Sequence, residues 1–186
     1  MIHVMGGTLR GRRLKTVRGI QCRPSLGRTR EALFSMLGDR VAGAHILDLF
    51  AGTGALGIEA LSRGALSATF VEYHRPMARI LKENLENCGL QKTGRILIQS
   101  TDRALPSIAD RSKGLILADP PYDLIWPKPE DWRQLGRILI PAGCFVLEAR
   151  FDRLIEGPES LWVERLGRVY GDTRLEIFIR GDIGDG

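Results

Sequence analysis

Between residues 45 and 148 the chain alternates short apolar runs with amphipathic segments, and this alternation restricts its fold more than any other feature of the sequence. Apolar runs bounded by Gly and Pro predict strands, whereas apolar residues spaced three or four positions apart predict helices. Strands that alternate with helices are typical of a parallel, doubly wound α/β sheet. We therefore predict strands over 45–50, 68–72, 95–99, 114–119 and 144–148, and helices over 55–63, 76–88, 103–108 and 129–138.

The pattern changes near both ends of the chain. Residues 161–168 and 174–180 predict two strands joined by a polar turn at 170–173, which would complete a seven-stranded, mostly parallel sheet with an antiparallel hairpin. Residues 29–38 predict a short amphipathic helix ahead of the first strand. The expected parts are a basic arm with this helix at 1–40, an α/β domain at 41–180 and a frayed tail at 181–186.

Positive charge is concentrated in the first thirty residues, which contain eight Lys and Arg residues and no carboxylate. The rest of the chain carries 19 basic and 22 acidic residues, so the net charge of +5 comes from this arm. A basic arm on a near-neutral body suits a protein that binds a polyanion, and guanidinium groups pair bidentately with phosphates. The alternative is a solvated terminus that only aids solubility. The candidate RNA-binding residues are Arg10, Arg12, Arg13, Lys15, Arg23 and Arg30.

Composition also excludes some classes of protein and site. No apolar stretch approaches the roughly 20 residues of a membrane span. The N-terminus lacks the apolar region of a secretory signal, so we expect a cytoplasmic protein that does not contact a membrane. The three cysteines and three histidines are scattered along the sequence, and no metal site is predicted.

The segment 48–57 carries the first motif with chemical content. Gly52, Gly54 and Gly57 satisfy the GxGxxG spacing between a predicted strand and a predicted helix, and Glu72 ends the next strand. Glycines let the backbone approach a ligand at a helix N-terminus, and an acid on the second strand accepts hydrogen bonds from ribose hydroxyls. The motif therefore predicts a cofactor that contains adenosine. A purely structural turn with helix-packing glycines is the alternative.

Two features favour S-adenosylmethionine over a nicotinamide dinucleotide as this cofactor. Asp48 is expected in the loop before the glycines, where it would repel a pyrophosphate but attract a sulfonium and an ammonium group. The chain also has little room for a second mononucleotide-binding half. Asp102 follows the third predicted strand, where it could accept a hydrogen bond from the adenine amino group or act as a helix N-cap.

The second motif is Asp119-Pro120-Pro121-Tyr122, at the carboxyl end of the fourth predicted strand. Two prolines cannot continue a strand, so the chain turns rigidly and fixes the direction of the Asp119 carboxylate and the Pro120 carbonyl. Both groups accept hydrogen bonds and could hold the exocyclic amino group of a base toward an electrophile. Tyr122 would stack on a base drawn out of its helix. A proline-rich loop without function is the alternative.

These residues resemble the (D/N)PP(Y/F/W) signature of amino-methyltransferases, which methylate exocyclic nitrogens of bases with S-adenosylmethionine. More narrowly, the chain resembles the bacterial 16S rRNA (guanine-N2)-methyltransferase family over nearly its whole length. The residues that carry the resemblance are Gly6-Gly7, Arg10-Gly11-Arg12-Arg13-Leu14, Arg23-Pro24, Arg30-Glu31-Ala32-Leu33-Phe34, 48–57, Leu61-Ser62-Arg63-Gly64-Ala65, Val71-Glu72, 119–122 and Tyr170-Gly171-Asp172-Thr173.

The resemblance implies a Rossmann-like class I methyltransferase whose site residues can be assigned by position. It implies that Glu72 binds the ribose, that Gly52 and Gly54 lie beside the methionine part, and that Asp102 lies near the adenine. The complete set predicted to bind the cofactor is Asp48, Phe50, Ala51, Gly52, Thr53, Gly54, Glu72, Tyr73 and Asp102. The residues predicted to hold the guanine are Asp119, Pro120, Pro121 and Tyr122.

The chain departs from the family pattern at two positions. His74 stands where the family commonly has an acid, and Ser25 stands where it commonly has Thr. Despite these departures, the resemblance implies a protein that acts as a monomer and without a metal. Its substrate would be the small-subunit rRNA or the assembling 30S particle. The alternatives are a DNA amino-methyltransferase, an RNA-binding assembly factor without turnover, and a nicotinamide-dependent oxidoreductase.

Overall fold

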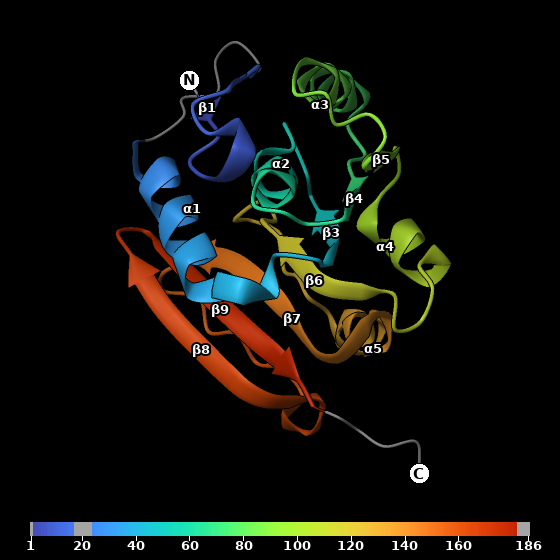
Figure 1. Cartoon of the computed structure of the whole chain (residues 1–186). Coiled ribbons are helices and arrows are strands. Elements are labelled where there is room, and N and C mark those ends of the chain that lie inside the picture. The colour runs from blue at the N-terminus through green and yellow to red at the C-terminus, as the bar shows by residue number, and fades with distance from the viewer. Residues whose placement is uncertain (1, 17–23, 182–186) are drawn as a thin grey trace.

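The computed structural model describes residues 2–16 and 24–181, and it contains a seven-stranded sheet in the order β5-β4-β3-β6-β7-β9-β8. The first five strands in this order are parallel, and β9 and β8 complete the sheet as an antiparallel hairpin (Figure 1). The predicted doubly wound α/β fold is confirmed. The strands of this sheet are β3 (His45–Leu49), β4 (Ser67–Val71), β5 (Gly94–Leu97), β6 (Lys113–Ala118), β7 (Leu139–Arg150), β8 (Trp162–Tyr170) and β9 (Thr173–Arg180).

Helices cover both faces of this sheet, as the alternating sequence predicts (Figure 1). One face carries α1, α2 and α3, and the other carries α4 and α5. Short 3-10 turns extend several of these helices. The helices are α1 (Pro24–Leu37), α2 (Ala55–Ser62), α3 (Arg75–Asn87), α4 (Thr101–Ala104) and α5 (Pro129–Ile138), with 3-10 turns η1 (Gly7–Leu9), η2 (Gly38–Arg40), η3 (Leu105–Ser107) and η4 (Glu159–Leu161).

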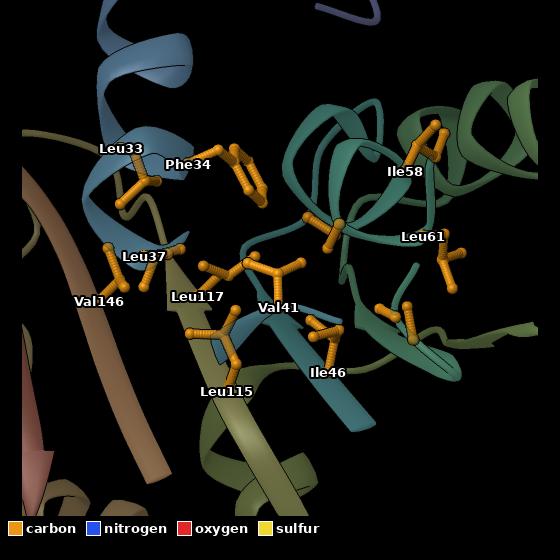
Figure 2. Packing of buried hydrophobic residues seen from close by; sticks show 14 of the residues in the cluster. Leu33, Phe34, Leu37, Val41, Ile46, Ile58, Leu61, Leu115, Leu117 and Val146 are labelled. Carbon is orange, nitrogen blue, oxygen red and sulfur yellow. The ribbon is translucent and has the colours of Figure 1, made fainter. Parts of the chain in front are cut away.

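The core consists of two apolar layers, one on each face of the sheet. Figure 2 shows the first layer, in which Leu33 and Phe34 of α1 and Ile58 of α2 lie over residues of the sheet such as Leu115 and Leu117. The second layer lies under α4 and α5 and contains several large aromatic side chains. Because the helices are buried against both faces, the strand ends are the part of the sheet left for a ligand.

Most predicted elements differ from the structure by one or two residues at an end, and two begin five residues earlier than predicted. Helix α1 begins at Pro24, five residues before the predicted start, and proline is favoured in the first turn because it needs no N–H partner. Strand β7 begins at Leu139 rather than at residue 144. Its register against β6 shifts between Lys113 and Leu115, so a bulge absorbs the Pro and Gly residues that suggest a loop in the sequence.

The N-terminal arm contains a small sheet that the sequence analysis did not predict. Strands β1 (Ile2–His3) and β2 (Arg13–Leu14) pair antiparallel. Val4 and Leu14 are buried in the same apolar layer as α1 and α2. The arm is therefore packed onto the α/β body, and the boundary expected at residue 40 stays a prediction.

Some expectations fall outside the described residues, including those for Arg23 and for the tail beyond residue 181. Within the described part of the chain, no helix is both long and apolar enough to cross a membrane.

Candidate active site

The carboxyl ends of the parallel strands surround a cavity of about 860 Å³. Its walls come from residues that directly follow β4, β5 and β6, from the end of β7, and from the turn between β8 and β9. Ligands of open α/β sheets bind at this edge because loops diverge there and leave a crevice. Residues 119–122 of the second motif line this cavity together with Phe50 and Glu72, which adjoin the glycine loop.

The glycine motif forms a tight connection between β3 and α2. Gly52 has a φ of 55°, a conformation that favours glycine. Gly57 packs so closely against β4 that a Cβ atom there would lie 2.3 Å from the Phe70 ring. Its backbone N–H donates a hydrogen bond to the Asp48 carboxyl at 2.9 Å. Asp48 belongs to β3, not to the loop where we expected it, and is 1% exposed.

Glu72 holds the loop of the glycine motif from the neighbouring strand. One of its carboxylate oxygens accepts a hydrogen bond from the Gly52 N–H at 2.8 Å, and the other accepts one from the His74 N–H at 2.7 Å. The side chain is 6% exposed and lines the cavity. Because His74 takes part through its backbone, the departure from the family pattern at this position leaves this interaction unchanged. The oxygens of Glu72 keep lone pairs that could accept hydrogen bonds from a ribose.

Phe50, between β3 and the glycines, adopts a φ of 58° that is unusual for a residue with a side chain. Its ring lines the cavity and packs edge-on against Trp126, with ring centroids 5.0 Å apart. Strained residues of this kind cluster at functional sites. The packing of Phe50 therefore joins the glycine loop to the loop that follows Tyr122.

The structure divides the predicted cofactor residues into two groups. Phe50, Glu72, Tyr73 and Asp102 line the cavity. The other predicted residues build the adjoining strand and loop without lining the cavity, namely Asp48, Ala51, Gly52, Thr53 and Gly54. Their direct contact with a cofactor stays a prediction.

The four residues 119–122 line the same cavity as Glu72. The Tyr122 hydroxyl lies 3.1 Å from the Thr173 hydroxyl, which ties this loop to the β8–β9 turn. Arg153 donates hydrogen bonds to the carbonyl oxygens of Leu124 and Trp126, each at 2.8 Å. These three hydrogen bonds, together with the two prolines, therefore fix the loop in place.

Asp119 is joined by a second carboxyl that the sequence analysis missed. Glu148, at the end of β7, lines the same cavity and is 7% exposed. Desolvation by the surrounding protein raises the pKa of Asp119 to about 6, although the residue is exposed to the cavity. Burial, and then the charge of Asp119, raises the pKa of Glu148 to about 8. Both shifts are upward and the larger one is on Glu148, so a proton shared by the pair favours Glu148 over Asp119.

The cavity as a whole is acidic. Its described lining contains six carboxyl groups and one cation, Lys128. This charge suits a cationic ligand and opposes a pyrophosphate, because a like charge in a partly buried site is weakly screened. Among the described residues, no group of three or more His, Cys, Asp and Glu side chains is placed to hold a metal ion.

The predicted RNA-binding residues fall into different environments. Arg10, Arg12 and Arg13 are exposed around a shallow hollow that also includes Asn87 at the end of α3. Lys15 forms a salt bridge of 2.7 Å with Glu83 on the surface. The exposed arginines thus remain candidates for contact with phosphates.

Asn84 of α3 connects this arm to the glycine loop. Its side-chain amide donates to the Thr53 carbonyl at 2.9 Å and to the Lys15 carbonyl at 3.1 Å. Its side-chain oxygen accepts from the Lys15 N–H at 2.7 Å. The basic arm is therefore fixed beside the candidate cofactor loop.

Arg30 is placed differently from the other predicted RNA-binding residues. It is 8% exposed, its guanidinium lies 3.5 Å from the Glu59 carboxylate, and it donates a hydrogen bond to the His3 carbonyl. Glu59 is fully buried and also accepts hydrogen bonds from the N–H groups of Met5 and Gly6. The charge of Arg30 therefore serves to attach the arm to α2 and is not presented at the surface.

Comparison with known proteins places this geometry among methyltransferases. The family model described as Conserved hypothetical protein 95 matches residues 2–179. The chain is 40% identical over 186 residues to the Bacillus subtilis protein named "Putative rRNA methyltransferase YlbH", covering 95% of this chain and 98% of that protein. It is 37% identical over 123 residues to the Escherichia coli "Ribosomal RNA small subunit methyltransferase D", covering 65% and 60% of the two chains.

A solved structure supports the same grouping. The Escherichia coli protein described as "Putative methyltransferase yhhF" superimposes with a TM-score of 0.83 at 29% sequence identity. The superposition covers 97% of this chain and 98% of that one, so the arm, the sheet and the hairpin all have counterparts.

Proposed function

Because the chain belongs to the family described as Conserved hypothetical protein 95, we propose that it transfers a methyl group from S-adenosylmethionine to the exocyclic N2 of one guanine in small-subunit rRNA. The coarser activity, methylation of small-subunit rRNA with S-adenosylmethionine, agrees with the names of its relatives. The observation that carries the finer proposal is the position of Asp119 and Pro120 in the same cavity as Glu72. One cavity can thus hold both an adenosine and an amino group.

The cavity fits the proposed cofactor in charge and in hydrogen bonding. Glu72 is positioned by two backbone N–H groups and is available to ribose hydroxyls, and Asp102 lies nearby to accept from an adenine amino group. The six carboxyls attract a sulfonium and an ammonium group. They speak against a nicotinamide dinucleotide, whose pyrophosphate they would repel.

When bound, S-adenosylmethionine supplies a methyl group that its positively charged sulfur already activates. The protein therefore has to position the target nitrogen, whose lone pair is delocalised into the base. The Asp119 carboxylate and the Pro120 carbonyl accept hydrogen bonds from the two amino hydrogens and turn the N2 atom toward the methyl carbon. Tyr122 stacks on the base. Positioning of this kind can supply much of the rate.

The proposed transfer is direct and needs neither a metal nor a covalent enzyme intermediate. The N2 atom forms a bond to the methyl carbon, and the electron pair of the broken carbon–sulfur bond remains on sulfur. The Asp119 carboxylate or water then accepts a proton from N2. An ionised Asp119 is needed for both tasks, which its pKa of about 6 allows at neutral pH.

The substrate is proposed to be small-subunit rRNA, free or within the assembling 30S particle, in the cytoplasm. Arg10, Arg12 and Arg13 would contact phosphates and supply salt-dependent affinity. The shape of the RNA would select one guanine. We further propose that the protein acts as a monomer.

The deciding experiment measures transfer of a labelled methyl group to unmodified small ribosomal subunits, free rRNA and duplex DNA, followed by nucleoside analysis. We expect N2-methylguanosine in rRNA, lost in Asp119→Ala and retained in the surface control Asp152→Ala. Label in DNA alone would contradict the proposal in favour of a DNA amino-methyltransferase. Tight cofactor binding without any transfer would indicate an assembly factor.

A further inference from the structure

Glu148 is a buried carboxyl in the cavity to which the mechanism above gives no task. The β6–β7 register pairs Ala118 with Leu147, so Asp119 and Glu148 occupy the next position on the two neighbouring strands. Side chains at paired positions of adjacent strands point to the same face. Both residues line the cavity, and their charges interact. Glu148 thus lies beside the acid that is to hold the target nitrogen.

Packing alone does not explain a carboxyl at this position. Its neighbours in β7, Leu147 and Ala149, are apolar and buried. Among the described residues, no hydrogen bond or salt bridge to the Glu148 side chain is present. Arg30 is the cation whose charge acts on it, but the guanidinium of Arg30 already lies against Glu59 and His3. A buried carboxyl costs free energy unless its polar atoms find partners, and the cavity is where such partners can bind.

We propose that Glu148 is a specificity-determining residue that recognises the N1–H group of the target guanine. This inference rests on the proposed function. With the base bound, the Glu148 hydroxyl donates a hydrogen bond to the Asp119 carboxylate, and the Glu148 carbonyl oxygen accepts a hydrogen bond from N1–H. Burial raises the pKa of Glu148, which favours a proton on this carboxyl and is consistent with this arrangement. The second oxygen of the Asp119 carboxylate remains free to accept from N2–H.

This arrangement distinguishes guanine from the other bases that carry an exocyclic amino group. Guanine places a donor, N1–H, next to its amino group. Adenine and cytosine place a bare acceptor nitrogen there. The one proton of the carboxyl pair is on the Glu148 hydroxyl and is used in the hydrogen bond to Asp119. Glu148 therefore presents only its carbonyl oxygen, an acceptor, to the base. A bare ring nitrogen would face that acceptor without a proton, and unpaired polar groups in a buried site reject a ligand strongly.

The test uses a base that keeps the amino group and lacks N1–H. Once wild-type protein has located the target nucleotide, that guanine is replaced by 2-aminopurine in otherwise unmodified small subunits. The quantity measured is the ratio of kcat/KM for guanine to kcat/KM for 2-aminopurine. Wild-type protein, Glu148→Gln, Glu148→Met and the exposed control Glu164→Gln are compared. Thermal unfolding and S-adenosylhomocysteine binding show that each variant is folded.

We expect Glu148→Gln to keep the wild-type ratio, because its amide can donate to Asp119 and accept from N1–H. Glu148→Met should lower the ratio about tenfold or more, as expected for one lost base-reading contact. A merely structural role would lower both values of kcat/KM together and leave the ratio unchanged, which would overturn the inference. A ratio in Glu148→Gln as low as that in Glu148→Met would overturn the inference as well.

Failure of the proposed function gives a different result. Wild-type protein would then form no N2-methylguanosine in any substrate, and the assignment of Glu148 would fall with the function. An active wild-type enzyme whose ratio does not respond to Glu148→Met contradicts the assignment of Glu148 alone.

Discussion

The hydroxyl of Tyr122 lies 3.1 Å from the hydroxyl of Thr173, so the loop that is to hold the target base is attached to the turn of the C-terminal hairpin. The two residues are 51 positions apart in the sequence. Both line the cavity. The hairpin therefore does more than close the sheet, because it helps to orient the ring on which the base would stack.

The roles of the Tyr122 ring and hydroxyl can be separated by substitution. Tyr122→Ala removes the stacking surface and should lower kcat/KM about 10- to 100-fold, since stacking on an aromatic ring contributes about 1–3 kcal/mol per base. Tyr122→Phe and Thr173→Val remove only the link and should each lower kcat a few-fold, with cofactor affinity unchanged. Steady-state methyl transfer and calorimetry measure these quantities. Equal losses in the Ala and Phe variants would show that the hydroxyl, not the ring, matters.

Substitution of Glu72 should weaken cofactor binding and loosen the glycine loop together. Glu72→Gln removes the charge that accepts the N–H groups of Gly52 and His74. Because hydrogen bonds to charged groups contribute about 1.5–3 kcal/mol, we expect at least a tenfold loss of affinity for S-adenosylhomocysteine by calorimetry. Glu86→Gln, on the exposed side of α3, is the control and should bind like the wild type. Unchanged affinity in Glu72→Gln would remove Glu72 from the cofactor site.

Asp48 should make the stability of the protein depend on pH. Its burial raises the pKa of the folded state from 3.8 to about 7, so the folded protein holds a proton that the unfolded chain releases. Stability is then greatest below pH 4, falls as the pH rises to 7, and stays level above it. Asp48→Asn keeps an acceptor for the Gly57 N–H without this dependence. Relative to wild type, its free energy of unfolding should rise by about 4 kcal/mol between pH 4 and pH 8.

Urea unfolding of the cofactor-free protein at the two pH values measures this difference. If the free energies of unfolding of Asp48→Asn and wild type differed by the same amount at both pH values, Asp48 would be ionised in the folded protein.

Arg12 should contribute to RNA affinity without contributing to the fold. Arg12→Ala should weaken binding to small-subunit rRNA and reduce the slope of log affinity against log salt by about one, if its guanidinium neutralises one phosphate. Filter binding over a series of salt concentrations measures the slope. Arg133→Ala, at an exposed position of α5, removes the same charge from the other face of the sheet. Equal slopes for these two variants would argue against a localised RNA-binding arm.

Arg30 should show the opposite behaviour to Arg12. Its guanidinium is buried beside Glu59, and removal of one partner leaves the other charge buried without full compensation. Arg30→Met should therefore lower the free energy of unfolding by about 3–5 kcal/mol. Denaturant unfolding measures this change. If Arg30→Met had the stability of the wild type and bound RNA more weakly, Arg30 would be an RNA-binding residue.

The contrast between these two arginines shows what the sequence can predict. The glycine motif, Glu72 and residues 119–122 were found because each lies in a short segment whose spacing expresses its chemistry. Arg30 looks like a member of a local basic cluster, and its partner Glu59 is known only once α1 packs on α2. Charge counted along the sequence therefore overestimates the charge available at the surface.

Glu148 was missed for a related reason. It is the only acid in the apolar run 144–149, and the run predicts a buried strand. That single carboxylate in a strand buried on both faces was a usable signal, because an acid is rarely buried without a partner. Its neighbour Asp119 becomes evident only from the order of the strands. The β1–β2 pair was missed because strands of two residues have no periodicity to detect.

The position of β9 has a consequence for how the protein is made. This strand comes last along the described chain, yet it lies inside the sheet, between β7 and β8. A ribosome that has synthesised the chain only as far as β8 has therefore made a strand that has no place to pair. Thr173, at the start of β9, is also needed for the link to Tyr122. A growing chain thus cannot complete its site until residues 173–180 have left the ribosome, and truncation before them removes β9 from the sheet and the link to Tyr122 from the site.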